Sequence, residues 1–179
     1  MSYDIYLRDP VTGETAEVPG HLMVGGTFRA EYHPETGTFT PALNTEAHLN
    51  ITYNYGSYYY EAADENGIWS IYGMTGGDSI AVLEKMIKIL ETKYKINDEW
   101  IYTKREKTIY LDEKKGNVVR DLLDVIMKKL PVKKKKITVN RYEGPNRDYW
   151  EPTAANAIKP LYQLIALAKM RPDCIWDGD

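Results

Sequence analysis

The segment covering residues 154–170 is the feature that most constrains the fold of this chain. Twelve of its seventeen residues are apolar. A helix that is apolar on nearly every side is buried, so the rest of the chain must supply layers that cover it. Pro160 interrupts the pattern, because its ring leaves the carbonyl of Asn156 without a helical donor. We therefore predict a buried core helix that either begins near Lys159 or kinks.

Two further patterns predict the layers around that helix. Residues 3–8 alternate apolar and polar side chains, as a half-buried strand does. The sequence Asp-Pro-Val-Thr-Gly at 9–13 has the chemistry of a turn, so a hairpin is expected with its return strand over residues 14–18. Apolar residues then recur at helical spacing over residues 79–94.

Composition and pattern together define the expected class. The chain has 179 residues, 43% of them apolar and 27% charged, which is typical of a globular protein. We predict one α+β domain over residues 1–179, in which an antiparallel sheet is packed by the helix at 79–94 and by the buried C-terminal helix. A basic β-α-β insertion is predicted over residues 95–147. No apolar run approaches a membrane-spanning length, and no secretory signal is expected at the N-terminus.

The predicted insertion carries most of the positive charge. Residues 81–147 hold eighteen basic and ten acidic residues, and they include a run of four lysines at Lys133, Lys134, Lys135 and Lys136. Strands are expected near residues 100–111 and 137–142, with an amphipathic helix at 119–130. The lysine run predicts either a phosphate-binding patch or a solvated strand edge. The interleaved acidic residues weaken the first interpretation, so nucleic-acid binding is a minor hypothesis.

Residues 47–61 form the most distinctive stretch. They are rich in β-branched and aromatic residues, which predicts a strand with a bend at Gly56. Period two places four polar side chains on one face: His48, Asn50, Thr52 and Asn54. Asn is depleted in strands, so this face indicates side chains with specific partners, which are backbone groups, buried water or a ligand. Tyr55, Tyr58, Tyr59, Tyr60 and Trp150 add candidate stacking walls or an interface hot spot.

A glycine-rich loop precedes the helix at 79–94. Free N–H groups at a helix start attract anions, but the Gly73–Ser79 loop lacks the lysine of a phosphate loop. Asp78 or Ser79 is the expected N-cap. Four residues of this loop and of the C-terminal helix complete the candidate binding set: Tyr72, Thr75, Gly76 and Asn156.

Metal and cysteine chemistry have little support. His21, His33 and His48 show no metal-ligand spacing, and no cofactor is expected. Cys174 is expected to be a small buried apolar residue rather than a nucleophile. Residues 177–179 are expected to form a solvated acidic tail.

Several segments resemble an uncharacterised family of small phage and prophage proteins. They are the Ser-Tyr-Asp start, the Leu-Asn-Ile-Thr-Tyr-Asn block at 49–54, the Ile71–Gly76 loop and the Trp-Asp-Gly-Asp end at 176–179. The resemblance is weaker across residues 95–147. It implies a mobile-element origin and a bacterial cytosol, and it carries no activity to this chain.

The leading hypothesis is a non-enzymatic binding protein of phage origin that interferes with a host factor. Its partner would be a host defence protein or a nucleotide-like signal, and its oligomeric state is left open. The first alternative is an enzyme acting on a nucleotide or sugar, with His48 as acid or base. The second is nucleic-acid binding or mimicry, in which the lysine run holds a polyanion or the acidic N-terminal half imitates one.

Overall fold

The computed structural model describes residues 2–25, 30–96, 102–112, 118–119 and 132–179. The chain divides into two compact units, one made of Met1–Ile101 with Glu143–Asp179 and the other of Tyr102–Tyr142. Paired strands in the described residues are antiparallel, and long helices pack together in the first unit. The predicted α+β class is therefore confirmed.

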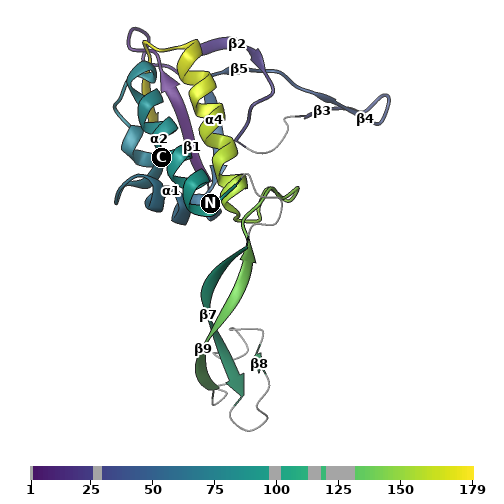
Figure 1. Cartoon of the computed structure of the whole chain (residues 1–179). Helices are drawn as coiled ribbons and strands as arrows, with labels where there is room; N and C mark the ends of the chain where they lie inside the picture. The colour runs from purple at the N-terminus through teal and green to yellow at the C-terminus, as the bar shows by residue number, and fades with distance from the viewer. Residues whose placement is uncertain (1, 26–29, 97–101, 113–117, 120–131) are drawn as a thin grey trace. The chain divides into compact units, whose positions relative to one another are not determined.

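A three-stranded sheet of order β10-β1-β6 organises the first unit (Figure 1). Its strands are β1 (Ser2–Arg8), β6 (His48–Thr52) and β10 (Ile175–Gly178). One face of the sheet contributes most of its side chains to the core: Tyr3, Ile5, Leu7, Leu49, Ile51 and Trp176. Period two along each strand leaves the polar residues between them on the opposite face.

Two long helices contribute the other half of this core. They are α2 (Gly76–Tyr94) and α4 (Ala154–Met170), which pack against each other and lie beside the sheet (Figure 1). The indole N–H of Trp176 donates to Ser79 Oγ at 2.7 Å and so joins β10 to α2. The helix predicted at 79–94 and the buried C-terminal helix are both confirmed. None of the helices in the described ranges has the length and apolar character that crossing a membrane requires.

The start of α4 excludes one of the two alternatives raised by Pro160. The helix begins at Ala154, six residues before the proline, and continues through it, so a start near Lys159 is wrong. Thr153 is the N-cap, and its hydroxyl accepts from the Asn156 N–H at 3.2 Å. A capped first turn of good helix formers thus establishes the helix before the proline is reached.

The predicted strand over residues 47–61 is wrong beyond Thr52. There β6 ends, Tyr53–Tyr55 form a turn of 3₁₀ helix (η1), and α1 (Gly56–Ala62) follows. The Thr52 hydroxyl accepts from the Asn54 N–H at 3.2 Å and caps the new turn. Buried side chains then recur at helical spacing: Tyr55, Tyr58, Tyr59 and Ala62. Burial of this face against the core outweighs the β propensity of tyrosine.

Three smaller expectations also need correction. The turn at 9–13 forms and residues 14–16 return beside the end of β1, with a bridge Arg8↔Thr15 and the Ala16 N–H donating to the Leu7 carbonyl at 2.7 Å, but β2 (Glu17–His21) pairs with β5 (Asn44–Glu46). The N-cap of α2 is Thr75, not Asp78 or Ser79, because its hydroxyl accepts from the Asp78 N–H at 3.1 Å. Asp177 and Gly178 of the predicted acidic tail belong to β10, which pairs with β1.

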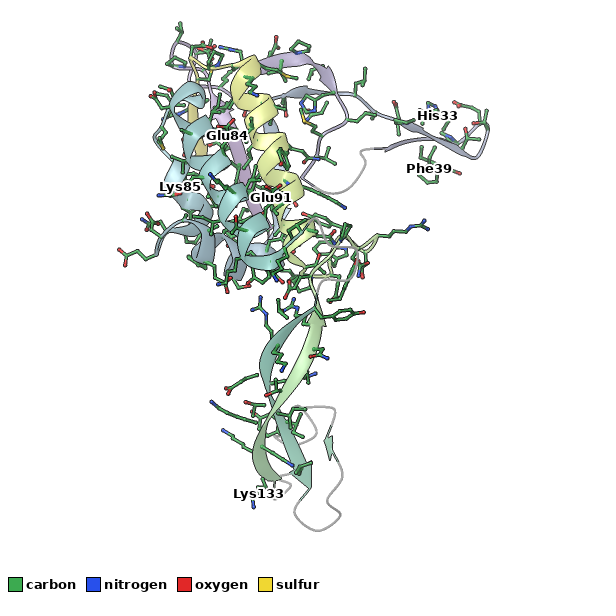
Figure 2. The ribbon with its side chains drawn as sticks, viewed as in Figure 1. His33, Phe39, Glu84, Lys85, Glu91 and Lys133 are labelled. Carbon is green, nitrogen blue, oxygen red and sulfur yellow. The ribbon has the colours of Figure 1, made fainter. Side chains whose placement is uncertain are left out.

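A separate hairpin in the first unit consists of β3 (Ala30–His33) and β4 (Thr38–Pro41). Figure 2 shows His33 and Phe39 on it. The Tyr32 and Phe39 rings are 5.0 Å apart between centroids, and both side chains are exposed.

The second unit is a long β-ribbon. Its strands are β7 (Tyr102–Asp112) and β9 (Val132–Tyr142), with the two-residue β8 (Val118–Val119) paired to β7. Strands were predicted at 100–111 and 137–142, and both are present with shifted ends. The amphipathic helix predicted at 119–130 lies outside the described residues, apart from Val119, which is in β8. One domain with an insertion at 95–147 stays a prediction.

Candidate functional site

The open face of the sheet carries a small polar cluster. Asn50 donates its side-chain amide to Asp4 Oδ1 at 2.6 Å and to Ser2 Oγ at 2.8 Å. His48 Nε2 lies 3.2 Å from the same Asp4 oxygen. Asp4↔Asn50 is a directly opposed pair of β1 and β6, so strand register brings these groups together. The specific partners that the sequence indicated for Asn50 are therefore side chains of β1.

The loop at Tyr149 and Trp150 meets the end of β6. The Thr52 N–H donates to the Tyr149 hydroxyl at 2.7 Å, and that hydroxyl lies 3.2 Å from the Asn50 carbonyl oxygen. Asn54 donates its side-chain amide to the Trp150 carbonyl at 2.8 Å. The structure thus brings Trp150 beside three predicted site residues that precede it by about a hundred positions, because Asn50, Thr52 and Asn54 all bond to the loop at Tyr149 and Trp150.

Tyr55, the next predicted residue, is buried beneath this loop. Its hydroxyl donates to the Tyr149 carbonyl, and burial, together with the neighbouring Tyr149 and Asp148, raises its pKa above the ordinary value. The Trp150 ring lies 5.3 Å from the Tyr149 ring and remains exposed. Trp150 is the more exposed residue of this pair, since Tyr149 is partly buried.

The start of α2 directs its first N–H groups at the chain itself. Gly76 donates to the Cys174 carbonyl at 2.8 Å and Gly77 to the Pro172 carbonyl at 3.0 Å. A Cβ at Gly76 would lie 2.5 Å from the Arg171 carbonyl oxygen, so only glycine permits this approach. Thr75 is occupied as the N-cap. A ligand at Thr75 or Gly76 would have to replace these bonds, and their part in binding stays a prediction.

Tyr72 and Asn156 are placed at two other points. The Tyr72 hydroxyl is buried without a hydrogen-bond partner among the described residues, and burial raises its pKa. Asn156 is buried and organises the loop before α4, because its amide donates to the Asp148 and Glu151 carbonyls and its Oδ1 accepts from the Asn146 N–H. Neither side chain joins the polar cluster at β6, and the assignment of both as binding residues stays a prediction.

An exposed group of aromatic rings, which we call the aromatic patch, consists of Tyr53, Tyr60 and Trp69. The sequence indicated only Tyr60 of these three as a candidate contact residue. All three are partly exposed and surround the buried ring of Tyr3. The Tyr3 centroid lies 4.3 Å from that of Tyr53 and 5.7 Å from that of Trp69, both edge-on. Burial, with the neighbouring Tyr60 and Tyr53, raises the pKa of Tyr3 to about 12.

Three separate elements supply the aromatic patch. Tyr53 comes from η1, Tyr60 from α1 and Trp69 from the short 3₁₀ helix η2 (Gly67–Ile71). A Cβ at Gly56 would lie 2.8 Å from the Tyr3 hydroxyl, so this glycine lets α1 approach β1. The signal in the sequence was the density of tyrosine at 53–60, which a strand prediction could not combine with Trp69.

The described residues give little support for a nucleophile or a metal site. Cys174 is buried, and burial raises its pKa to about 11. Within the same residues, no three His, Cys, Asp or Glu side chains are grouped as metal ligands would be. The His48–Asp4 contact is the one arrangement above that resembles an oriented base.

Comparisons with protein-family models, curated proteins and solved structures give no match for this chain. The interpretation of the site therefore depends on its own geometry.

Proposed function

We propose that this chain is a non-enzymatic binding protein that attaches to a partner protein through the aromatic patch. The observation that carries the proposal is the partial exposure of three large rings held on a buried fourth: Tyr53, Tyr60 and Trp69 are 36%, 44% and 39% exposed. Trp and Tyr are enriched at binding hot spots because each buries a large area and keeps a polar group. Rings fixed by packing also lose little conformational entropy on binding.

The target class comes from the resemblance to phage proteins. A phage protein in a bacterial cytosol meets host factors, so a host protein, and within that class a defence protein, is the proposed partner. A nucleotide-like signal is the other target, and the polar cluster at Asn50 with Trp150 is the surface that supports it, because amides and an exposed ring are groups that recognise a base.

One observation favours an enzyme as the second candidate. His48 has an orienting carboxylate in Asp4 at 3.2 Å, which is the arrangement a general base needs. A substrate of the nucleotide or sugar class would then lie on the open face of the sheet.

The test is co-purification from bacterial cells that express the tagged chain. We expect one host protein to co-purify with the wild type. The amount recovered with Tyr60→Ala/Trp69→Ala should be at least about tenfold lower, since truncating a hot-spot residue costs about 2 kcal/mol or more of binding free energy. Tyr162→Ala is the matched control, because Tyr162 is an exposed tyrosine of α4 outside the aromatic patch.

The affinity of the purified chain for the purified host protein is then measured. An affinity that is equal in Tyr60→Ala/Trp69→Ala and in the control Tyr162→Ala would contradict the aromatic patch as the binding surface. Loss of a turnover activity in His48→Ala, with binding intact, would favour the enzyme. A retained mass of a few hundred daltons in native mass spectrometry that disappears in Asn50→Ala would instead favour a small ligand.

A further inference from the structure

The ribbon of β7 and β9 carries its charges unequally on its two faces. The strands pair from Tyr102↔Tyr142 to Asp112↔Val132, and directly opposed residues of an antiparallel pair project to the same face. One face, which we call the basic face, holds five cationic residues: Arg105, Lys107, Lys133, Lys135 and Arg141. No acidic residue of either strand shares that face.

The opposite face mixes charges of both signs. It holds Lys104, Lys134 and Lys136 together with Glu106. Lys136 Nζ lies 3.2 Å from Glu106 Oε2, and Lys134 Nζ lies 5.9 Å from the centroid of the Tyr110 ring. Glu106, which interrupts the positive charge of β7, thus lies on the face away from the five cations.

The basic face has the length of a surface for an extended polyanion, and its three lysines are its exposed cations. Lys107, Lys133 and Lys135 are exposed, whereas Arg105 and Arg141 are partly buried, and Figure 2 shows Lys133 on the ribbon. A strand of eleven residues spans about 35 Å, which is about one turn of B-DNA. Lysines two residues apart on one face are separated by about 6.7 Å, twice the rise of about 3.4 Å per phosphate of one DNA strand.

We propose that the basic face binds duplex DNA, with the ribbon in the major groove and its lysines directed at phosphates. That groove admits a two-stranded β-ribbon, which β7 and β9 form except at Tyr110 and Leu111, where β8 also pairs with β7. Lysine contacts to phosphates carry no sequence information, so binding is expected to be independent of sequence. Lysines that only protect the edge of β9 from pairing have no reason to be separated from acidic residues by face. This proposal is independent of the aromatic patch, which belongs to the other unit.

The experiment titrates the full chain into a labelled duplex of about two helical turns and follows fluorescence anisotropy at several salt concentrations. Each phosphate contact contributes about −0.9 to the slope of log K against log salt. Lys107→Gln/Lys133→Gln/Lys135→Gln is expected to weaken binding at least about tenfold and to reduce the slope by about 2.7. Tyr60→Ala/Trp69→Ala is expected to bind DNA as the wild type does.

The matched control removes three lysines from the opposite face of the same two strands: Lys104→Gln/Lys134→Gln/Lys136→Gln. We expect its affinity to stay within about threefold of the wild type, because its charges point away from the duplex. All six lysines are exposed, so both variants are expected to fold, which circular dichroism checks.

Four results would overturn the proposal. Two concern DNA itself: binding that does not depend on salt, and equal losses of affinity in the two triple variants. The third is an equal affinity for duplex RNA, because the major groove of RNA is too narrow for a ribbon. The fourth is lysine-dependent binding to phosphatidylserine vesicles without binding to DNA. The last result would assign the basic face to a membrane surface.

Discussion

Asn50 shows how an unusual residue in a strand is explained by its neighbours. Its amide nitrogen donates to Ser2 and Asp4 of the adjacent strand, at 2.8 and 2.6 Å, so its donors are used within the sheet. Cys174 is a second residue whose chemistry depends on its surroundings, because its potentially reactive thiol is buried away from solvent. Its burial raises the pKa of the thiol to about 11, and a thiol rather than a thiolate is a poor nucleophile.

We predict that Cys174 reacts with a disulfide reagent at pH 8 at least about a hundredfold more slowly in the native protein than in urea, since an ordinary thiol has a pKa of about 8.5. The release of the coloured thiolate measures the rate. Cys174→Ala/Ser57→Cys is the control, because Ser57 is exposed on α1 and its replacement should react rapidly without denaturant. A native rate for Cys174 close to the denatured one would show that the buried position opens readily.

At the scale of elements, the start of α4 shows how a distant residue completes a helix. Its first four N–H groups all have acceptors: Ala154 donates to Glu143 Oε2 at 3.1 Å and Ala155 to the Glu143 carbonyl, while Thr153 accepts the next two through its hydroxyl and carbonyl. The Glu143 side chain is buried, and its charge lies at the positive end of the helix dipole.

We predict that Glu143→Ala lowers the free energy of unfolding by about 3 kcal/mol, because buried donors lose a charged acceptor. The Tyr58 hydroxyl, which donates to the same carboxylate at 2.5 Å, is among them. Urea unfolding measures the loss. Glu151→Ala is the control, since Glu151 has the same charge near the same helix start but is exposed, and it should change stability by less than about 0.5 kcal/mol. Equal effects would mean that the carboxylate of Glu143 contributes only its charge.

At the scale of the whole first unit, Arg171 joins the two ends of the chain. Its guanidinium lies 2.7 Å from Asp9 Oδ2, 3.2 Å from Asp173 Oδ2 and 3.3 Å from the Glu17 carbonyl. It therefore connects the end of α4 to the turn after β1 and to the start of β2. The hydrogen bond from Arg171 lowers the pKa of Asp9 and that of Asp173 below the ordinary value.

These lowered pKa values predict a stability that depends on Arg171 at acid pH. A carboxylate with a folded pKa below its unfolded pKa contributes its full stabilisation above the unfolded value of about 3.9 and loses it as the pH falls through the folded value. The Tm of the wild type should therefore fall more steeply than that of Arg171→Gln as the pH is lowered from about 5 to about 2. Arg8→Gln, which removes the exposed pair of Arg8 with Asp177, is the control and should keep the steep wild-type dependence. Parallel curves for wild type and Arg171→Gln would contradict this role.

The sequence by itself determined the elements whose pattern has one interpretation. The alternation at residues 3–8 predicted β1 and the helical period at 79–94 predicted α2, because a period of two or of 3.6 residues follows directly from which face is buried. The apolar content of residues 154–170 predicted the buried helix α4. The sequence did not determine the tyrosine-rich stretch after Thr52, where β propensity and helical spacing disagree.

Only the tertiary structure decided that disagreement and the composition of the candidate surfaces. Packing of Tyr55, Tyr58 and Tyr59 into the core made α1 a helix, since burial of three large rings outweighs a small local propensity. The aromatic patch and the basic face combine residues from separate elements or opposed strands. Their members are neighbours through packing and register, which depend on the whole fold and are absent from any local pattern.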